Sequence, residues 1–261
     1  IQNPKNPVLS GDESGTLVFD HVSFQYPDGE APVLRDITFE AGRGDTVAFI
    51  GSTGSGKSTL INLIPRFYDI SSGSIRIDNV DVRKYDLKAL REKIGFIPQK
   101  ALLFTGSITE NIRYGKHDAV RSEVEHSAKV AQAYDFITEK PHQFDEMIEE
   151  GGGNVSGGQR QRLSIARAVV RKPDIYIFDD SFSALDFKTD ANLRKKLKEE
   201  TKGAITLIVA QRVTSIMDAT KIIVLNEGVV VGMGTHRELL KSCSIYHEIA
   251  TSQLSEEELA Q

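Results

Sequence analysis

The amino-acid sequence predicts an α/β fold with a mainly parallel sheet, an N-terminal antiparallel β subdomain and an inserted α-helical subdomain. Segments 16–24 and 33–41 alternate apolar and polar residues, as antiparallel strands with one solvated face do. Later short segments are continuously apolar, which is typical of strands covered on both faces. Residues 107–172 have mostly helical periodicity and lie between two of these strands. The continuously apolar segments are 45–50, 93–99, 174–180, 204–210 and 221–228.

Composition excludes several classes of protein. The 261 residues suit one large domain, or one domain with a subdomain, at about 150 residues per domain. With 32 Lys and Arg against 37 Asp and Glu, the net charge is −5, so no nucleic-acid partner is expected. The single cysteine, Cys243, cannot form an internal disulfide and no charged-then-apolar leader opens the chain, which favours a reducing cytosolic environment. The apolar runs are far shorter than the ~18 residues that span a bilayer, so this piece is expected to be soluble by itself.

The chain divides by composition and periodicity. Its first residues have no periodicity and contain prolines and small polar residues, so we expect a linker or the cut start of a longer chain there, with ordered structure beginning near Thr16. The acidic end of the sequence is expected to be a terminal helix or tail with a solvated face. The expected divisions are 1–15 for the linker, 16–250 for the domain (core 16–99 and 173–250, helical subdomain 100–172) and 251–261 for the tail.

A glycine-rich loop follows the apolar segment 45–50. Residues 51–58 read GSTGSGKS, match the pattern G-x-x-x-x-G-K-[ST] and precede a helical run. Glycines let backbone N–H groups point into one concavity, and a lysine supplies a full charge to the β- and γ-phosphates of a nucleotide. We therefore predict a P-loop nucleoside triphosphatase, rather than a glycine-rich turn that binds nothing. The residues expected at the nucleotide are Gly51, Ser52, Thr53, Gly54, Ser55, Gly56, Lys57, Ser58 and Thr59.

Two carboxylates end the apolar segment at 174–180. Asp179 and Asp180 follow four apolar residues, and like charges at a strand end repel unless a cation is present. A P-loop enzyme needs an acidic group there to hold Mg²⁺ opposite the loop hydroxyl. We assign Asp179 and Ser58 to Mg²⁺, directly or through water. The alternative is a pair of exposed acids.

A second helix start contains glycines. Ser156, Gly157, Gly158 and Gln159 read SGGQ and open the helical run 160–170, with Ser156 as a plausible N-cap. By itself this string is weak evidence, because small polar residues precede many helices. Between the phosphate loop and the acidic strand, however, it makes the chain resemble the nucleotide-binding domain of ATP-binding cassette (ABC) transporters, from about Thr16 to about Ile249.

The resemblance implies roles for single residues. SGGQ corresponds to the signature motif, and Tyr26 lies where the family stacks an aromatic ring on adenine, unless it is an ordinary tyrosine at a strand end. Gln99 matches the Q-loop glutamine, which reaches Mg²⁺ and the attacking water. Glu150 falls where exporters carry an acid facing the coupling helices, and residues 183–186 look like the D-loop, which crosses a dimer interface.

The resemblance also implies an assembly. Residues 98–115 are similar to the exporter type, in which this domain usually follows a transmembrane domain, so residues 1–15 would be the cut end of a longer chain. Two such domains bind head to tail, with each ATP between the phosphate loop of one and the signature of the other. The implied cofactors are ATP and Mg²⁺, and the implied partners are a second nucleotide-binding domain and an exporter's transmembrane domain. The implied location is the cytoplasmic face of the cell membrane.

Two positions depart from the family pattern. The family has Glu after the metal-binding Asp, as general base or water-positioner, whereas this chain has Asp180. The missing methylene withdraws the carboxylate by roughly 1–1.5 Å, and a misplacement of that size can cost ~10²-fold in rate. The family's switch histidine is Gln211 here, which keeps a donor but carries no charge. Together, Gln99, Asp180 and Gln211 describe a catalytic set that we expect to be degenerate, as in one half of a heterodimeric exporter with an intact, non-identical partner.

Other readings remain open. An ordinary homodimeric exporter ATPase that tolerates Asp180 is the nearest rival. A nucleotide-gated dimerisation module without catalysis is another. A soluble ABC ATPase of DNA repair or translation is disfavoured, because such proteins carry coiled-coil insertions or two cassettes and this sequence shows neither.

Overall fold

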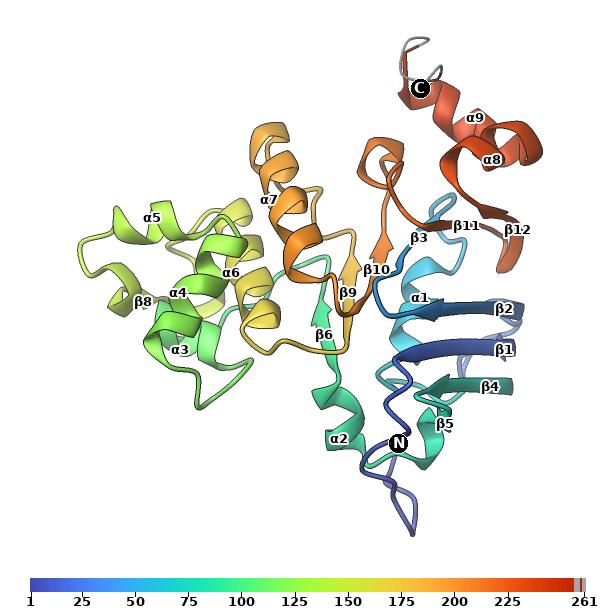
Figure 1. Cartoon of the computed structure of the whole chain (residues 1–261), viewed down its shortest axis with the longest axis horizontal. Helices are drawn as coiled ribbons and strands as arrows, with labels where there is room; N and C mark the ends of the chain where they lie inside the picture. Colours follow the sequence, from blue (N-terminus) through green and yellow to red (C-terminus); the bar gives the residue numbers. More distant parts are fainter. Residues whose placement is uncertain (256–258, 260–261) are drawn as a thin grey trace. The chain divides into compact units, whose positions relative to one another are not determined.

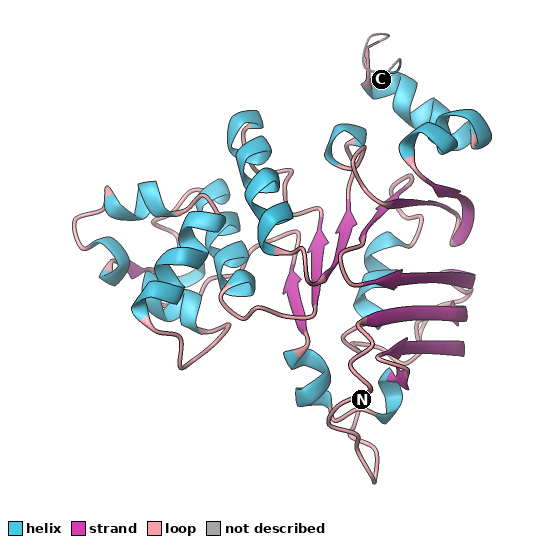
Figure 2. Ribbon diagram, in the orientation of Figure 1, coloured by secondary structure: helices cyan, strands magenta, loops and turns pink. Residues whose placement is uncertain are grey.

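The computed structural model describes residues 1–255 and 259. The chain forms two compact units, one made of residues 1–94 and 204–261 and the other of residues 95–203 (Figure 1). Strands dominate the first unit and helices the second (Figure 2). The α/β fold with an antiparallel β subdomain is confirmed.

An antiparallel sheet opens the first unit. Its order is β2-β1-β4-β5, and β1 pairs with β2 and β4, with Phe19 opposite both Phe39 and Ile75. A bulge follows Phe19, where His21 takes a φ of 50°, and it lets Val22 and Phe24 stay buried with Leu17 and Phe19. The predicted alternation therefore shifts by one residue within β1. The strands are β1 (Thr16–Phe24), β2 (Leu34–Gly42), β4 (Ser72–Ile77) and β5 (Val80–Asp81).

A mixed, mainly parallel arrangement of strands forms the second layer of this unit. β3 lies between β10 and β11 and is parallel to both, with Ala48 opposite Ile208 and Ile222. β12 is antiparallel to β11. Nearly every residue of β3, β10 and β11 is buried, as their continuously apolar sequences predict. The bounds are β3 (Thr46–Ile50), β10 (Ile205–Val209), β11 (Lys221–Asn226) and β12 (Val229–Gly234).

Aromatic packing joins the two layers. The Phe39 ring stacks on Phe19, with centroids 4.6 Å apart, and meets Phe49 of β3 at 5.6 Å. All three side chains are at most 4% exposed. The strand that precedes the glycine-rich loop is thus fixed against the antiparallel sheet.

Short helices complete the first unit. They are α1 (Lys57–Leu63), η1 (Val82–Lys84), α2 (Leu87–Glu92), η4 (Val213–Ser215), α8 (His236–Ser242) and α9 (Ser244–Gln253). The acidic residues beyond α9, part of the expected tail, lie outside the described residues. Within the described part of the chain, no helix has the length and apolar character needed to cross a membrane.

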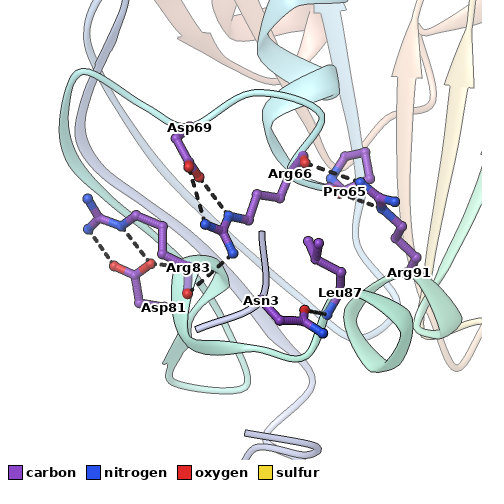
Figure 3. A network of polar contacts seen from close by, with 8 residues as sticks. All are labelled: Asn3, Pro65, Arg66, Asp69, Asp81, Arg83, Leu87 and Arg91. Carbon is purple, nitrogen blue, oxygen red and sulfur yellow. Dashed lines mark hydrogen bonds and ion pairs between the residues drawn. The ribbon is translucent and has the colours of Figure 1, made fainter. Parts of the chain in front are cut away.

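The N-terminal residues bind the edge of this unit. Residues 1–15 are all described and form no helix or extended strand, but Val8 donates to the Lys84 carbonyl and accepts from the Asp86 N–H, both at 2.9 Å. The Asn3 side chain accepts from Leu87 N at 2.8 Å (Figure 3) and donates to Asp86 Oδ2 at 2.8 Å. The segment expected to be a linker therefore helps to cap α2.

The second unit is mainly helical. Helices α3 to α6 lie where the sequence predicts helical periodicity, and β6 and β9 are neighbouring strands. The side chain of Ser107 caps α3 through a capping box with Glu110. The elements are β6 (Ile94–Ile97), β7 (Gly106–Ser107), α3 (Ile108–Arg113), α4 (Arg121–Val130), α5 (Tyr134–Thr138), η2 (Gln143–Asp145), β8 (Met147–Ile148), η3 (Glu150–Gly152), α6 (Gly157–Val169), β9 (Ile175–Asp179) and α7 (Phe187–Glu200).

A buried histidine lies at the start of α8. His236 is 5% exposed, and its Nδ1 shares a 2.7 Å hydrogen bond with the hydroxyl of the fully buried Tyr246. The described part of the chain offers no hydrogen-bond partner to its Nε2. Burial lowers the pKa of His236 below 6.5, and the nearby Arg237 charge lowers it further. The imidazole is therefore neutral in the folded protein at pH 7.

We expect stability to fall as the pH drops below about 6.5. The unfolded chain then protonates His236 while the folded chain does not, so the free energy of unfolding falls by up to about 1.4 kcal/mol per pH unit until the folded pKa is reached. Urea unfolding between pH 7.5 and 5 would measure this slope. His236→Phe should flatten it, and His247→Gln, at an exposed position, should leave it as in the wild type. An equal slope in His236→Phe would contradict the assignment.

Candidate nucleotide site

Backbone contacts define the glycine-rich loop of the first unit. The loop connects β3 to α1, and Gly51 leaves the strand with a φ of 153°. A Cβ on Gly51 would lie 2.0 Å from the carbonyl oxygen of Leu225, so a larger residue has no room. Gly56 precedes α1 with a φ of 99°. The sequence pattern therefore corresponds to a loop that requires glycine at both ends.

A positive charge lies over this loop. Lys57 Nζ donates to the carbonyl oxygens of Gly51 and Ser52, both at 2.8 Å, and to Ser55 Oγ at 3.1 Å. The exposed residues of the loop include Ser52, Thr53 and Gly54, and Ser58 at the start of α1 is exposed as well. A half-buried ammonium group held among loop oxygens, beside exposed loop residues, is suited to an anion with several oxygens, such as a phosphate chain.

Tyr26 lies beside the same helix. Its hydroxyl shares a 3.0 Å hydrogen bond with Thr59 Oγ1, and its ring meets Phe24 edge-on with centroids 4.8 Å apart. The side chain is half-buried. The structure thus brings Tyr26 close to α1, which carries Lys57 and Ser58.

Gln211 follows β10 in the first unit. It is exposed, and its carbonyl oxygen accepts from Gln253 Nε2 at 2.9 Å. The same Gln253 side chain accepts from Val213 N at 2.8 Å. One amide of α9 therefore holds the backbone on both sides of Arg212 and fixes the turn that carries Gln211.

The carboxylates of the second unit lie at the end of β9. Asp179 ends the strand, and Asp180 is 8% exposed with a φ of 47°. Asp is among the few residue types other than glycine that tolerate this left-handed conformation. Gln99 Nε2 donates to Asp180 Oδ2 at 3.1 Å. Ser181 Oγ donates to the Ile97 carbonyl at 2.8 Å, which ties the ends of β9 and β6 together.

Gln99 lies beyond its strand. β6 ends at Ile97, two residues earlier than the apolar pattern of 93–99 predicts, and Gln99 is exposed in the following loop. Pro98 interrupts the strand because proline has no N–H for a ladder hydrogen bond. The Pro98 carbonyl instead accepts from Gln161 of α6 at 3.1 Å.

The SGGQ residues form the start of α6. Ser156 Oγ accepts from Gln159 N at 3.2 Å and Gln159 Oε1 accepts from Ser156 N at 3.0 Å, a capping box that confirms Ser156 as the N-cap. A Cβ on Gly158 would lie 3.3 Å from the Ala184 carbonyl, so the SGGQ segment packs closely against residues 183–186. Both segments belong to the second unit. Within it, Asp186 caps α7, and its hydrogen bonds from Thr189 lower the pKa of the carboxyl.

The candidate residues are distributed over both units. The first unit brings Tyr26 to residues 51–59 and also contains Gln211, whose backbone is held by Gln253. The second unit brings together Gln99 and Asp180 next to Asp179, and separately SGGQ with residues 183–186. Sequence reasoning missed Gln253 and the link between Tyr26 and Thr59. Neither has a local signal, because each depends on a contact between residues more than thirty positions apart.

The residues assigned to Mg²⁺ have suitable chemistry. Ser58 supplies a hydroxyl, Asp179 a carboxylate and Gln99 an amide oxygen, and its amide nitrogen already donates to Asp180. Mg²⁺ prefers such oxygen donors, in small number, together with nucleotide phosphates and water. Among the described residues, no group of three or more His, Cys, Asp or Glu side chains could hold a metal, so a site supplied by the protein alone is not found there.

Fold and site together define a P-loop nucleotide-binding protein. A model of the ABC transporter family matches residues 34–183. The chain belongs to the ABC transporter family, which confirms the resemblance drawn from its sequence.

Similar proteins cover nearly the whole chain. An uncharacterised ABC transporter ATP-binding protein of Mycobacterium tuberculosis is 44% identical over 97% of this chain and 44% of its own length. A protein of Staphylococcus aureus named for multidrug export as an ATP-binding/permease protein is 45% identical over 92% of this chain and 42% of its own length. The structure of a bacterial Atm1-family ABC exporter with ATP bound superposes with a TM-score of 0.94 at 35% identity, covering 98% of this chain and 45% of that one. The chain thus spans less than half the length of these relatives.

We expect Gln253→Leu to loosen the turn at Gln211. The substitution removes two hydrogen bonds to backbone, each worth about 1 kcal/mol, so amide hydrogen exchange in residues 211–215 should accelerate by about tenfold or more. Exchange measured by mass spectrometry reports this directly. Ser252→Ala, which removes only a bond within α9, is the matched control. Unchanged exchange in the Gln253 variant would show that other contacts fix the turn.

Proposed function

We propose that this chain is the ATP-binding and ATP-hydrolysing domain of an ABC exporter, which powers transport by ATP-driven head-to-tail dimerisation. The observation that carries the proposal is the loop at residues 51–58, where Lys57 Nζ lies among loop oxygens after the central strand β3. The relative named for multidrug export and the exporter structure with ATP bound support the exporter assignment. The domain would act at the cytoplasmic face of a membrane.

Each residue has a defined task in this proposal. Tyr26 stacks on the adenine base, the backbone of residues 51–59 donates to the phosphates, and Lys57 binds them through its side chain. Ser58, Gln99 and Asp179 would hold Mg²⁺, which neutralises charge on the β- and γ-phosphates when bound. Ser156, Gly157, Gly158 and Gln159 face the nucleotide of a second domain, because in this family two domains share each ATP.

We further propose that the chain's own site is degenerate. Asp180 is one methylene shorter than the family's Glu, and its Oδ2 accepts from Gln99, which draws the carboxylate toward the Q-loop. Gln211 offers an uncharged amide where the family has histidine. The site would bind MgATP and turn it over slowly, while this chain's signature completes the active site of a non-identical partner.

Two other functions would use the same fold. An ordinary homodimeric exporter ATPase would hydrolyse ATP at this site despite Asp180 and Gln211. A nucleotide-gated dimerisation module would bind ATP without hydrolysing it. Asp180 is buried and its carboxylate is held by a hydrogen bond from Gln99. A carboxylate that keeps a fixed position favours some residual hydrolysis over none.

Removal of the loop lysine tests ATP binding. Lys57→Ala deletes charge-assisted hydrogen bonds of about 1.5–3 kcal/mol, so the Kd for MgATP should rise by roughly 10- to 100-fold. Titration calorimetry would measure it. Lys195→Ala, an exposed lysine of α7, is the control and should bind as the wild type does. Equal Kd values for the wild type and the Lys57 variant would place the nucleotide elsewhere.

Restoration of the family residues tests the degenerate site. Asp180→Glu combined with Gln211→His should raise Mg²⁺-dependent ATP turnover by about tenfold or more, increasingly so at high protein concentration, because hydrolysis requires two domains. The same assay on each single variant separates the two contributions. Asp180→Asn, which has no carboxylate, should show no gain in turnover. A wild type as fast as the double variant would favour the homodimeric ATPase. Absent single-turnover hydrolysis, even with a partner, would favour the dimerisation module.

A further inference from the structure

Tyr26 is held by two rings and one hydrogen bond. Phe24, 1% exposed, meets it at an interplanar angle of 80°, and Tyr68 meets it at 87° with centroids 5.1 Å apart. The rings of Phe24 and Tyr68 also pack against each other, with centroids 5.6 Å apart. With the Thr59 hydrogen bond, these contacts fix both the tilt and the rotation of the Tyr26 ring. Tyr68 itself is 38% exposed, so it is not an ordinary core residue.

Hydrogen bonds between its own residues hold the loop that carries Tyr68. Arg66 takes a left-handed φ of 54° and is only 7% exposed. Its guanidinium donates to both carboxylate oxygens of Asp69, at 2.6 and 3.2 Å, and so closes the turn around Tyr68 (Figure 3). Bidentate Arg–carboxylate pairs fix geometry as well as adding energy.

Neighbouring elements pin the same loop from outside. Arg91 of α2 donates to the carbonyls of Pro65 at 3.2 Å and Arg66 at 3.4 Å (Figure 3). At the far end, Ser71 N donates to the Ser23 carbonyl at 2.9 Å and Ser71 Oγ accepts from Gln25 N at 3.0 Å. The loop with Tyr68 and the strand end with Tyr26 are thus parts of one hydrogen-bonded frame.

We propose that Tyr68 is a positioning residue for nucleotide binding. Tyr68 holds the Tyr26 ring in the plane where the base stacks, and it raises ATP affinity without touching ATP. The inference rests on the proposed function, in which Tyr26 is the stacking platform. A platform that is fixed before binding loses little rotamer freedom when the base arrives, so affinity rises. The free energy of an edge-to-face aromatic pair sets the size of the expected change in ATP affinity.

The frame acts on the base and not on the phosphates. Tyr68 contacts Tyr26 and Phe24, whereas the phosphate chain is assigned to Lys57 and the loop backbone. A ligand with phosphates but no base should therefore be insensitive to Tyr68. Inorganic tripolyphosphate with Mg²⁺ is such a ligand, and it separates positioning of the base from damage to the phosphate loop.

The test compares two ligands on the 261-residue chain by calorimetry. Tyr68→Leu should weaken MgATP binding by about three- to tenfold and leave binding of magnesium tripolyphosphate unchanged. Tyr68→Phe keeps the ring and should retain wild-type affinity for both. Tyr114→Leu replaces an exposed tyrosine that packs on Phe104 in the second unit, and it serves as the matched control. Thermal midpoints of all variants verify folding.

The possible results are distinct. Unchanged MgATP affinity in a folded Tyr68→Leu variant would overturn the inference and leave the proposed function standing. An equal loss for ATP and tripolyphosphate would also overturn it, because Tyr68 would then act through the phosphate loop. A wild type that binds neither ligand would overturn the proposed function itself, and the inference with it. If Tyr68→Leu fails to fold, Asp69→Asn loosens the same turn with the ring retained and should give a smaller but base-specific loss.

Discussion

The approach of Gly51 to the carbonyl oxygen of Leu225 is the contact on which the phosphate loop depends. A Cβ at Gly51 would lie 2.0 Å from that oxygen, so the chain can leave β3 along this path only with glycine. The path places Lys57 among the loop oxygens and starts α1 beside Tyr26. Because β3 is parallel to neighbours on both sides, the loop begins where the strand position is most constrained. The geometry of the site is therefore set by backbone packing before any side chain meets a ligand.

In each unit, the candidate charged and polar groups already make hydrogen bonds. Lys57 donates to its own loop, Gln99 donates to Asp180, and Ser156 and Gln159 cap α6 reciprocally. Such groups keep their geometry without a ligand, so less ordering is needed when one binds. The same engagement has a cost, since phosphate oxygens must compete with existing acceptors of Lys57.

Sequence reasoning succeeded where the cause was local and failed where it was distant. The buried strands, the loop at 51–58 and the cap at Ser156 follow from periodicity and short patterns, and the fold class follows from them. The apolar pattern of residues 93–99 predicts a strand that ends two residues too late. β6 ends at Ile97, because Pro98 has no N–H to donate to a neighbouring strand. The binding of Asn3 to α2 and of Gln253 to the turn at Gln211 joins residues far apart in the chain, and no short pattern encodes such pairs. Whether Asp180 and Gln211 weaken hydrolysis is decided by kinetics, since the pattern gives residue types and not rates.

The attachment of the first residues to α2 has a mechanical consequence. Val8 is hydrogen-bonded on both sides to the backbone around Tyr85, and Asn3 is bonded to the first turn of α2. A pull on the N-terminal end is therefore borne by these bonds before it reaches β1, which begins only at Thr16. Tension is therefore delivered first to the short helices η1 and α2, on either side of Tyr85.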